Sequence, residues 1–92
     1  MAKTFEEIVE MQRAADDAQA KAAELREMYG PPTVTPWTKQ QSDLYETAFR
    51  AWRDLARDLQ AEITEHAKEH GRPRSEVEAE VREQADSPAE GA

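Results

Sequence analysis

The sequence predicts an all-α protein, an antiparallel helical hairpin followed by a short third helix at the C-terminal end. Two stretches, residues 4–29 and 36–70, carry apolar side chains at intervals of three and four residues, the spacing that gathers them on one face of an α-helix. A proline-rich segment separates these stretches. A weaker stretch of the same kind, residues 75–85, follows a basic turn.

The first helix is predicted over residues 4–29. Thr4 is followed three residues later by Glu7, the capping-box pattern in which each side chain bonds the backbone N–H of the other residue. The apolar seam that follows steps by three and four residues and has alanine in its middle, so a neighbouring helix can approach closely. Its members are Ile8, Met11, Ala15, Ala18, Ala22, Leu25 and Tyr29.

The connection between the two long helices contains strong stop signals. Gly30 and the two prolines after it end the first helix. Two starts remain open for the second helix: Thr35 as the cap with Pro36 in the first helical position, or Thr38 and Gln41 as a second capping box. A connection of about six residues favours antiparallel neighbours.

The second helix, over residues 36–70, has an apolar face about 140° wide, broader than one neighbouring helix can cover. We therefore expect two hairpins to pair through this face into a four-helix bundle, which makes the protein a homodimer. The face consists of Leu44, Tyr45, Ala48, Phe49, Trp52, Leu55, Ala56, Leu59, Ile63 and Ala67.

The C-terminal part divides at Gly71, which ends the long helix. Residues 1–70 are predicted to form the hairpin, residues 71–86 a basic turn and a short helix, and residues 87–92 a disordered acidic tail. Ser75 and Glu78 form a third capping-box pattern. Because the apolar edge of this helix consists only of two valines, the helix either docks lightly or folds on binding.

Composition narrows the functional classes. The 92 residues carry a formal net charge of −8, which repels nucleic acid and anionic lipid unless a local basic patch offsets it. The absence of cysteine excludes disulfides and thiolate metal sites. No apolar run reaches the roughly 18 residues that a membrane span needs. We therefore expect a cytoplasmic protein with no membrane contact.

The strongest candidate site is a set of apolar and aromatic residues on the second helix. Four of the six aromatic residues lie between residues 37 and 52, and tryptophan and tyrosine dominate the energetics of protein interfaces. These side chains either fill the core of the hairpin or its dimer, or bind another protein. The candidate partner-binding residues are Tyr45, Phe49, Trp52, Leu55 and Leu59.

Two histidines form a weaker candidate site. His66 and His70 are four residues apart, a spacing that lets two imidazoles bind one metal from one helical face. Histidines near a helix C-terminus also interact favourably with the helix dipole without any metal. A metal-binding helical bundle is therefore the third functional hypothesis, and we assign no metal site.

The basic turn supports the second hypothesis, a nucleic-acid-associated transcriptional regulator. Arg72 and Arg74 are its candidate anion-binding residues, with the arginine row at positions 50, 53 and 57 as a possible extension. The turn and its flanks resemble the helix, turn and helix start of ribbon-helix-helix DNA-binding proteins, which implies phosphate contacts at the turn. That resemblance covers the run from Leu59 through Ala67 and Gly71-Arg72-Pro73-Arg74-Ser75-Glu76-Val77.

The chain departs from that family where residues 52–58 continue an amphipathic helix instead of forming a DNA-reading strand. No glycine-rich phosphate loop and no recognisable catalytic arrangement of serine, histidine and acid is present. We therefore expect no enzymatic activity, no catalytic residue and no cofactor. The first hypothesis is a small protein–protein interaction module, an adaptor or regulator, that acts through its apolar helical face.

Overall fold

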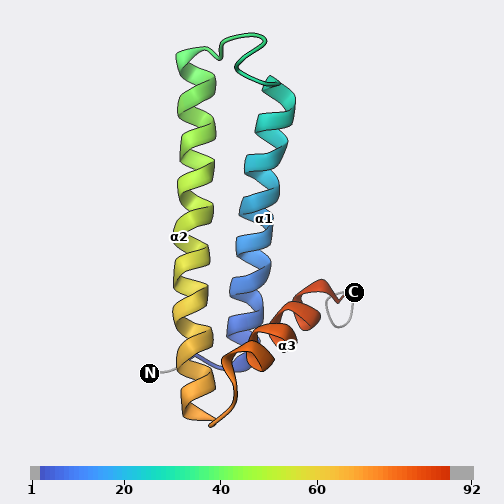
Figure 1. The fold of residues 1–92 in the computed structure, drawn as a ribbon, viewed down its shortest axis with the longest axis vertical. Helices are drawn as coiled ribbons and strands as arrows, with labels where there is room; N and C mark the ends of the chain where they lie inside the picture. Colours follow the sequence, from blue (N-terminus) through green and yellow to red (C-terminus); the bar gives the residue numbers. More distant parts are fainter. Residues whose placement is uncertain (1–2, 88–92) are drawn as a thin grey trace.

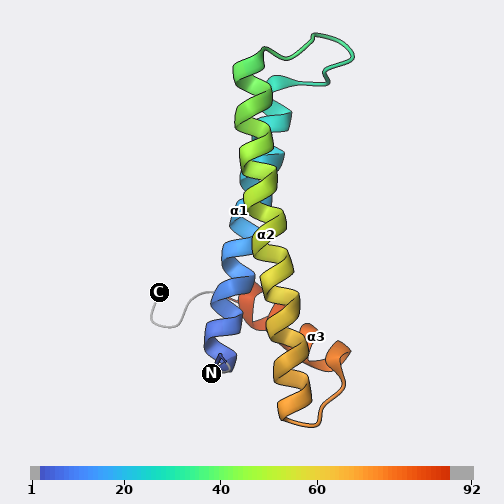
Figure 2. The ribbon, with the colours of Figure 1, turned by 90° about the vertical axis from the view of Figure 1, so that its left-hand side faces the viewer.

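The computed structural model describes residues 3–87 and contains three helices in that range, with no strand. They are α1 (Phe5–Tyr29), α2 (Lys39–Glu69) and α3 (Arg74–Asp86). The predicted all-α class is confirmed. α1 and α2 lie side by side and run in opposite directions, and α3 crosses them near the start of α1 and the end of α2 (Figures 1 and 2).

The ends of α1 are set by the residues that the sequence indicates. The Thr4 hydroxyl accepts a hydrogen bond from the Glu7 N–H at 3.2 Å, and the Glu7 carboxylate accepts one from the Thr4 N–H at 2.9 Å. This predicted capping box is therefore confirmed. The bond from the Thr4 N–H to the ionised carboxylate lowers the pKa of Glu7. At the other end Gly30 takes a positive φ of 75°, a conformation that glycine adopts without steric cost.

The second long helix begins at Lys39, at the later of the two starts that the sequence allows. The Thr38 hydroxyl accepts a hydrogen bond from the Gln41 N–H at 3.1 Å, and the Gln41 side-chain oxygen accepts one from the Thr38 N–H at 2.9 Å. The earlier start at Pro36 is wrong because Thr35 belongs to a separate turn, in which its N–H bonds the Pro31 carbonyl at 3.3 Å.

The end of α2 is a Schellman motif. Gly71 has a φ of +59°, and its N–H donates to the Lys68 carbonyl at 3.3 Å. The Arg72 N–H reaches back to the Ala67 carbonyl at 2.9 Å. The predicted stop at Gly71 is confirmed, and the motif turns the chain sharply into α3.

α3 begins one residue earlier than predicted and without a capping box. Its N-cap is Pro73, whose carbonyl accepts hydrogen bonds from the N–H groups of Glu76 and Val77 at 3.1 and 3.3 Å. The predicted cap at Ser75 is wrong because the extended backbone of Pro73 already supplies the non-helical position, which leaves Ser75 inside the first turn. Of the predicted tail, residues 88–92 lie outside the described part of the chain.

The core lies at the end of the molecule where α3 crosses the two long helices. Val77 and Val81 of α3 are 1% and 0% exposed, so α3 is docked through the two valines that the sequence identifies. On α2 burial begins only at Leu59 and continues through Ala67. The first half of α2 has no buried residue, although its apolar pattern is the same. The core cluster contains Ile8, Ala15, Leu59, Ile63, Ala67, Val77 and Val81.

Candidate protein-binding groove

A continuous series of aromatic contacts occupies the other end of the molecule, where α1 ends and α2 begins. Tyr29 contacts Trp37 and Trp37 contacts Tyr45, with ring centroids 5.5 and 5.2 Å apart. Tyr45 then stacks on Phe49 at 6.0 Å, and Phe49 meets Trp52 edge-on at 5.4 Å. We call these five residues the aromatic ladder. Neighbouring rings restrain one another in such contacts, so the ladder is a largely preformed surface.

One hydrogen bond joins the ladder to the end of α1. The Trp37 indole N–H donates to the Gly30 carbonyl at 2.7 Å. This bond satisfies the polar atom of a half-buried tryptophan and fixes the connection against α2. The conformation of the connection therefore contributes to the shape of the site.

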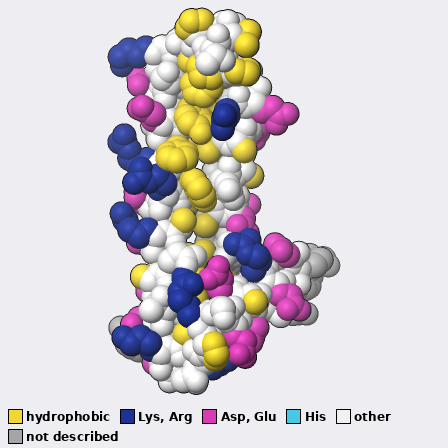
Figure 3. All heavy atoms as spheres, in the orientation of Figure 1, with side chains coloured by type: hydrophobic (Ala, Val, Ile, Leu, Met, Phe, Trp, Pro, Cys, Tyr) yellow, Lys and Arg dark blue, Asp and Glu magenta, His cyan; other side chains and the backbone are white. Residues whose placement is uncertain are grey.

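The ladder borders a groove of about 750 Å³ between the second half of α1 and the first half of α2. Small side chains on the α1 side leave this space open, among them Ala22 and Ala23. Figure 3 shows hydrophobic side chains gathered along this half of the molecule, between groups of charged side chains. The groove is lined by Gln19, Ala22, Ala23, Arg26, Glu27, Gly30, Pro31, Pro32, Thr33, Tyr45, Phe49 and Trp52.

Large exposed hydrophobic side chains are concentrated at the same end. Met28 is 68% exposed, Val34 78%, Leu44 49% and Phe49 36%. Across residues 3–87 these are the large hydrophobic residues that remain exposed, and all of them lie between positions 28 and 49. The molecule therefore has one end that is packed and another that presents apolar surface to its surroundings.

The predicted partner-binding residues fall into two groups. Tyr45, Phe49 and Trp52 line the groove together. Leu55 is half-buried against the core, and Leu59 is 2% exposed inside it. The structure therefore brings only the three aromatic residues together at a surface that a partner can reach.

Sequence reasoning missed the other half of this site. Tyr29 and Trp37 extend the ladder, and the alanines of α1 with the prolines of the connection form the opposite wall. The available signal was the run of small residues in the α1 seam next to a run of large ones in α2. That contrast predicts close packing or an open groove equally well, and only the structure separates the two.

The arginines of the basic turn contact acidic residues of α3. Arg72 forms a hydrogen-bonded ion pair with Glu76 at 2.9 Å and a second one with Glu80. Arg74 pairs with Glu78 at 2.6 Å and donates to the Thr64 hydroxyl at 3.1 Å. An incoming phosphate would have to compete with three carboxylates for these two guanidinium groups.

These ion pairs also shift the ionisation of their members. The hydrogen bond from Arg72 lowers the pKa of the Glu80 carboxyl below its ordinary value of 4.5. The same contact with Glu80, and to a smaller extent the contact with Glu76, raises the pKa of Arg72.

The arginine row on α2 also includes a paired residue. Arg57 forms an ion pair with Asp54 at 3.3 Å.

The two histidines lie next to each other without further metal-binding groups. Their ring centroids are 4.3 Å apart, and the Phe5 ring is 5.9 Å from that of His66. Within the described residues no group of three or more histidine, cysteine or acidic side chains is placed to hold a metal ion. His66 and His70 therefore offer two imidazoles and no third ligand.

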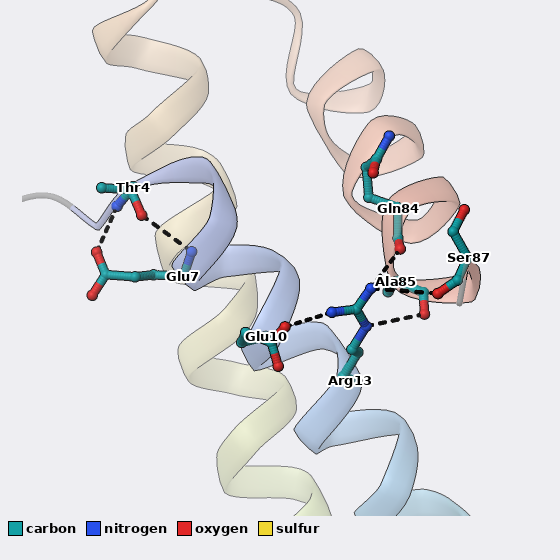
Figure 4. Close-up of polar contacts among 7 residues, drawn as sticks. All are labelled: Thr4, Glu7, Glu10, Arg13, Gln84, Ala85 and Ser87. Carbon is teal, nitrogen blue, oxygen red and sulfur yellow. Dashed lines mark hydrogen bonds and ion pairs between the residues drawn. The ribbon is translucent and has the colours of Figure 1, made fainter. Parts of the chain in front are cut away.

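One arginine of α1 holds the end of α3. The guanidinium of Arg13 donates to the carbonyl of Gln84 at 3.0 Å and to those of Ala85 and Ser87 at 3.4 Å each (Figure 4). The last turn of α3 has no basic residue of its own. A cation at this position bonds the last carbonyls of the helix and interacts favourably with the helix dipole. Arg13 thus fixes α3 against the start of α1, away from the groove.

Comparison with known proteins assigns neither a family nor a function to the chain. The chain matches no protein-family model, and no match was found among curated proteins or among solved structures. None of the helices in the described range combines the length and apolar character of a membrane span. The functional argument therefore rests on the groove and its surroundings.

Proposed function

We propose that the protein is a non-enzymatic protein–protein interaction module, an adaptor or regulator, whose binding surface is the groove beside the aromatic ladder. The observation that carries this proposal is the exposed apolar surface at the end of the molecule opposite the core. Exposed apolar patches of this kind mark interaction sites, and aromatic residues supply most of the binding energy at such sites.

The unit that presents the groove is a helical hairpin formed by α1 and α2, supported by the opposite directions of the two helices. The contacts within the ladder already restrict its side chains, so less side-chain conformational entropy is lost when a partner binds. A reducing cytoplasmic location is part of this proposal, because the chain has no cysteine. No specific observation favours the nucleic-acid or metal hypotheses, since the turn arginines are paired and the histidines have no third ligand among residues 3–87.

Site-specific photo-crosslinking in the cells that make the protein tests this function. A photoreactive amino acid replaces Ala23, which is exposed and lines the groove, or, as the matched control, Ala79, which is exposed on α3. Covalent protein adducts should form from position 23 and not from position 79. The additional change Phe49→Glu should remove them. Absence of adducts at position 23, or equal adducts at both positions, would refute the proposed binding surface.

A further inference from the structure

We propose that the groove is occupied by the same groove of a second copy, with the two chains antiparallel and overlapping only at the ends that carry the aromatic ladder. This inference rests on the proposed function and names its partner. Three observations support it: the distribution of charge along the molecule, the position of α3, and the area that the free end offers.

The first observation is that the groove end is electrically balanced. Residues 19–54, which contain the groove and the ladder, carry five basic and five acidic side chains. The remaining residues carry seven basic and fifteen acidic side chains, so the whole net charge of −8 belongs to them. The balanced set consists of Lys21, Arg26, Lys39, Arg50 and Arg53 with Glu24, Glu27, Asp43, Glu46 and Asp54.

This distribution of charge favours a second copy of the chain over a strongly basic partner. A strongly basic partner would find its complement at the acidic end, away from the groove. Two copies of an acidic protein repel each other unless they meet where the charge cancels. The groove end is that place, and a two-fold interface uses the same patch on both subunits, so the aromatic residues of one copy pack on those of the other.

The second observation, the position of α3, selects the orientation. Gln19 and Arg26 follow Gln12 by seven and fourteen residues, which places all three on one stripe of α1. Gln12 is 4% exposed and precedes Arg13, which bonds the end of α3, whereas Gln19 and Arg26 line the open groove. α3 therefore lies beside one half of this stripe, and the groove lies beside the other half.

A second chain laid parallel on this face would bring α3 against α3 and one acidic end against the other. An antiparallel chain shifted toward the groove end avoids both conflicts. Its acidic end then points away, at a separation near the 50 Å long axis of one chain. That separation is several times the Debye length of about 10 Å at 0.1 M salt, so repulsion between the acidic ends is screened.

The third observation is the area. Half of the 50 Å long axis, taken across two helices of about 10 Å diameter each, outlines about 500 Å² per copy, against about 800 Å² per partner in a standard interface. An interface of this size lies at the small end of specific interfaces, where weak and reversible complexes are found. The dimer is a four-helix bundle over the overlapping halves only, shorter than pairing along the full length of both hairpins.

Sedimentation equilibrium on the purified full chain, from micromolar to millimolar concentration, tests the proposal. The chain should pass from monomer to dimer, with little dependence on salt. Phe49→Glu should weaken the dimer at least about tenfold. Ala51→Glu is the matched control, because it adds the same charge to an exposed residue of α2 that lies outside the groove, about 160° away around the helix. It should leave the dissociation constant within about twofold.

Distances between spin labels test the orientation independently of those variants. The chain has no cysteine, so Ala20→Cys or Ala79→Cys gives a single labelling site in each copy. Ala20 is exposed on α1 and lies outside the groove lining, so labels there should leave the interface intact and lie close together across it. Labels at position 79 should be separated by nearly the 50 Å length of one chain.

Three results would overturn the proposal: a monomer at every concentration, short distances at both label positions, or loss of the dimer with Ala51→Glu and not with Phe49→Glu. These results are distinguishable from failure of the proposed function. A monomer whose groove still forms photo-adducts with another protein would retain the interaction module and remove only the second copy as its partner.

Discussion

Replacing Arg13 by glutamine should release the end of α3 while leaving the two long helices folded. The change removes a guanidinium that donates to three carbonyls at the end of α3, one at 3.0 Å and two at 3.4 Å. Glutamine keeps an amide donor and much of the side-chain length, but it carries no charge and is too short to reach all three acceptors.

The magnitude follows from these distances. Only the bond to the Gln84 carbonyl has an ordinary length, and hydrogen bonds to charged groups contribute about 1.5–3 kcal/mol when fully formed. The Arg13 side chain is 30% exposed, so water weakens this contribution. We expect a loss of about 1–2 kcal/mol in the docking free energy of α3, a factor of about 5–30 in its docking equilibrium.

Native-state amide hydrogen exchange measures this effect helix by helix. The amides of Val81 and Ala85 should exchange about 5–30-fold faster in Arg13→Gln, whereas those near Trp52 should be unchanged. Arg82→Gln is the matched control, since Arg82 is an exposed arginine of α3 itself. Unchanged exchange in α3, or an equal acceleration in all three helices, would refute the role assigned to Arg13.

Three further predictions follow from burial, capping and ionisation. Ile63→Ala should cost about 2–5 kcal/mol in chemical unfolding because Ile63 is fully enclosed, and the half-buried Trp52→Ala should cost less despite its larger side chain. Thr38→Ala should lose about 1 kcal/mol with its capping box, whereas Thr35→Ala should have little effect. Because its folded-state pKa is lowered, Glu80 stabilises the protein above its ordinary value of 4.5, and this stabilisation should disappear as the pH falls from 4.5 through the folded-state pKa. Thermal melts across that range should show a smaller pH dependence in Glu80→Gln, and an unchanged dependence would contradict the ion-pair assignment.

Local sequence signals were sufficient for the helices and most of their ends. Thr4, Gly30 and Gly71 act where the sequence places them, because caps and stops depend on neighbouring residues alone. The predicted cap at Ser75 was wrong because a capping box is recognised by residue types alone. In the structure the helix begins earlier, with Pro73 as its N-cap.

The limits of burial could not be predicted in the same way. The apolar pattern of α2 continues without a break from Leu44 to Ala67, yet residues become buried only from Leu59 onward. The difference lies in α3, which covers one end of the long helices and not the other. The role of Arg13 could not be predicted either, because Arg13 bonds a carbonyl 71 residues away and local sequence patterns do not indicate such contacts.

The position of α3 therefore divides the molecule into an end that holds the fold and an end that is free to bind. Substitutions in the core should lower stability without changing the groove, and Phe49→Glu should change association with little effect on the core, because Phe49 is 36% exposed. A preformed row of aromatic side chains beside an open groove favours aggregation unless something covers it. α3 does not cover this row, because Arg13 holds the end of α3 at the opposite end of the molecule. The arrangement leaves the groove open to another molecule, and in the proposed dimer a second copy meets it at the one end where the charges of this acidic chain cancel.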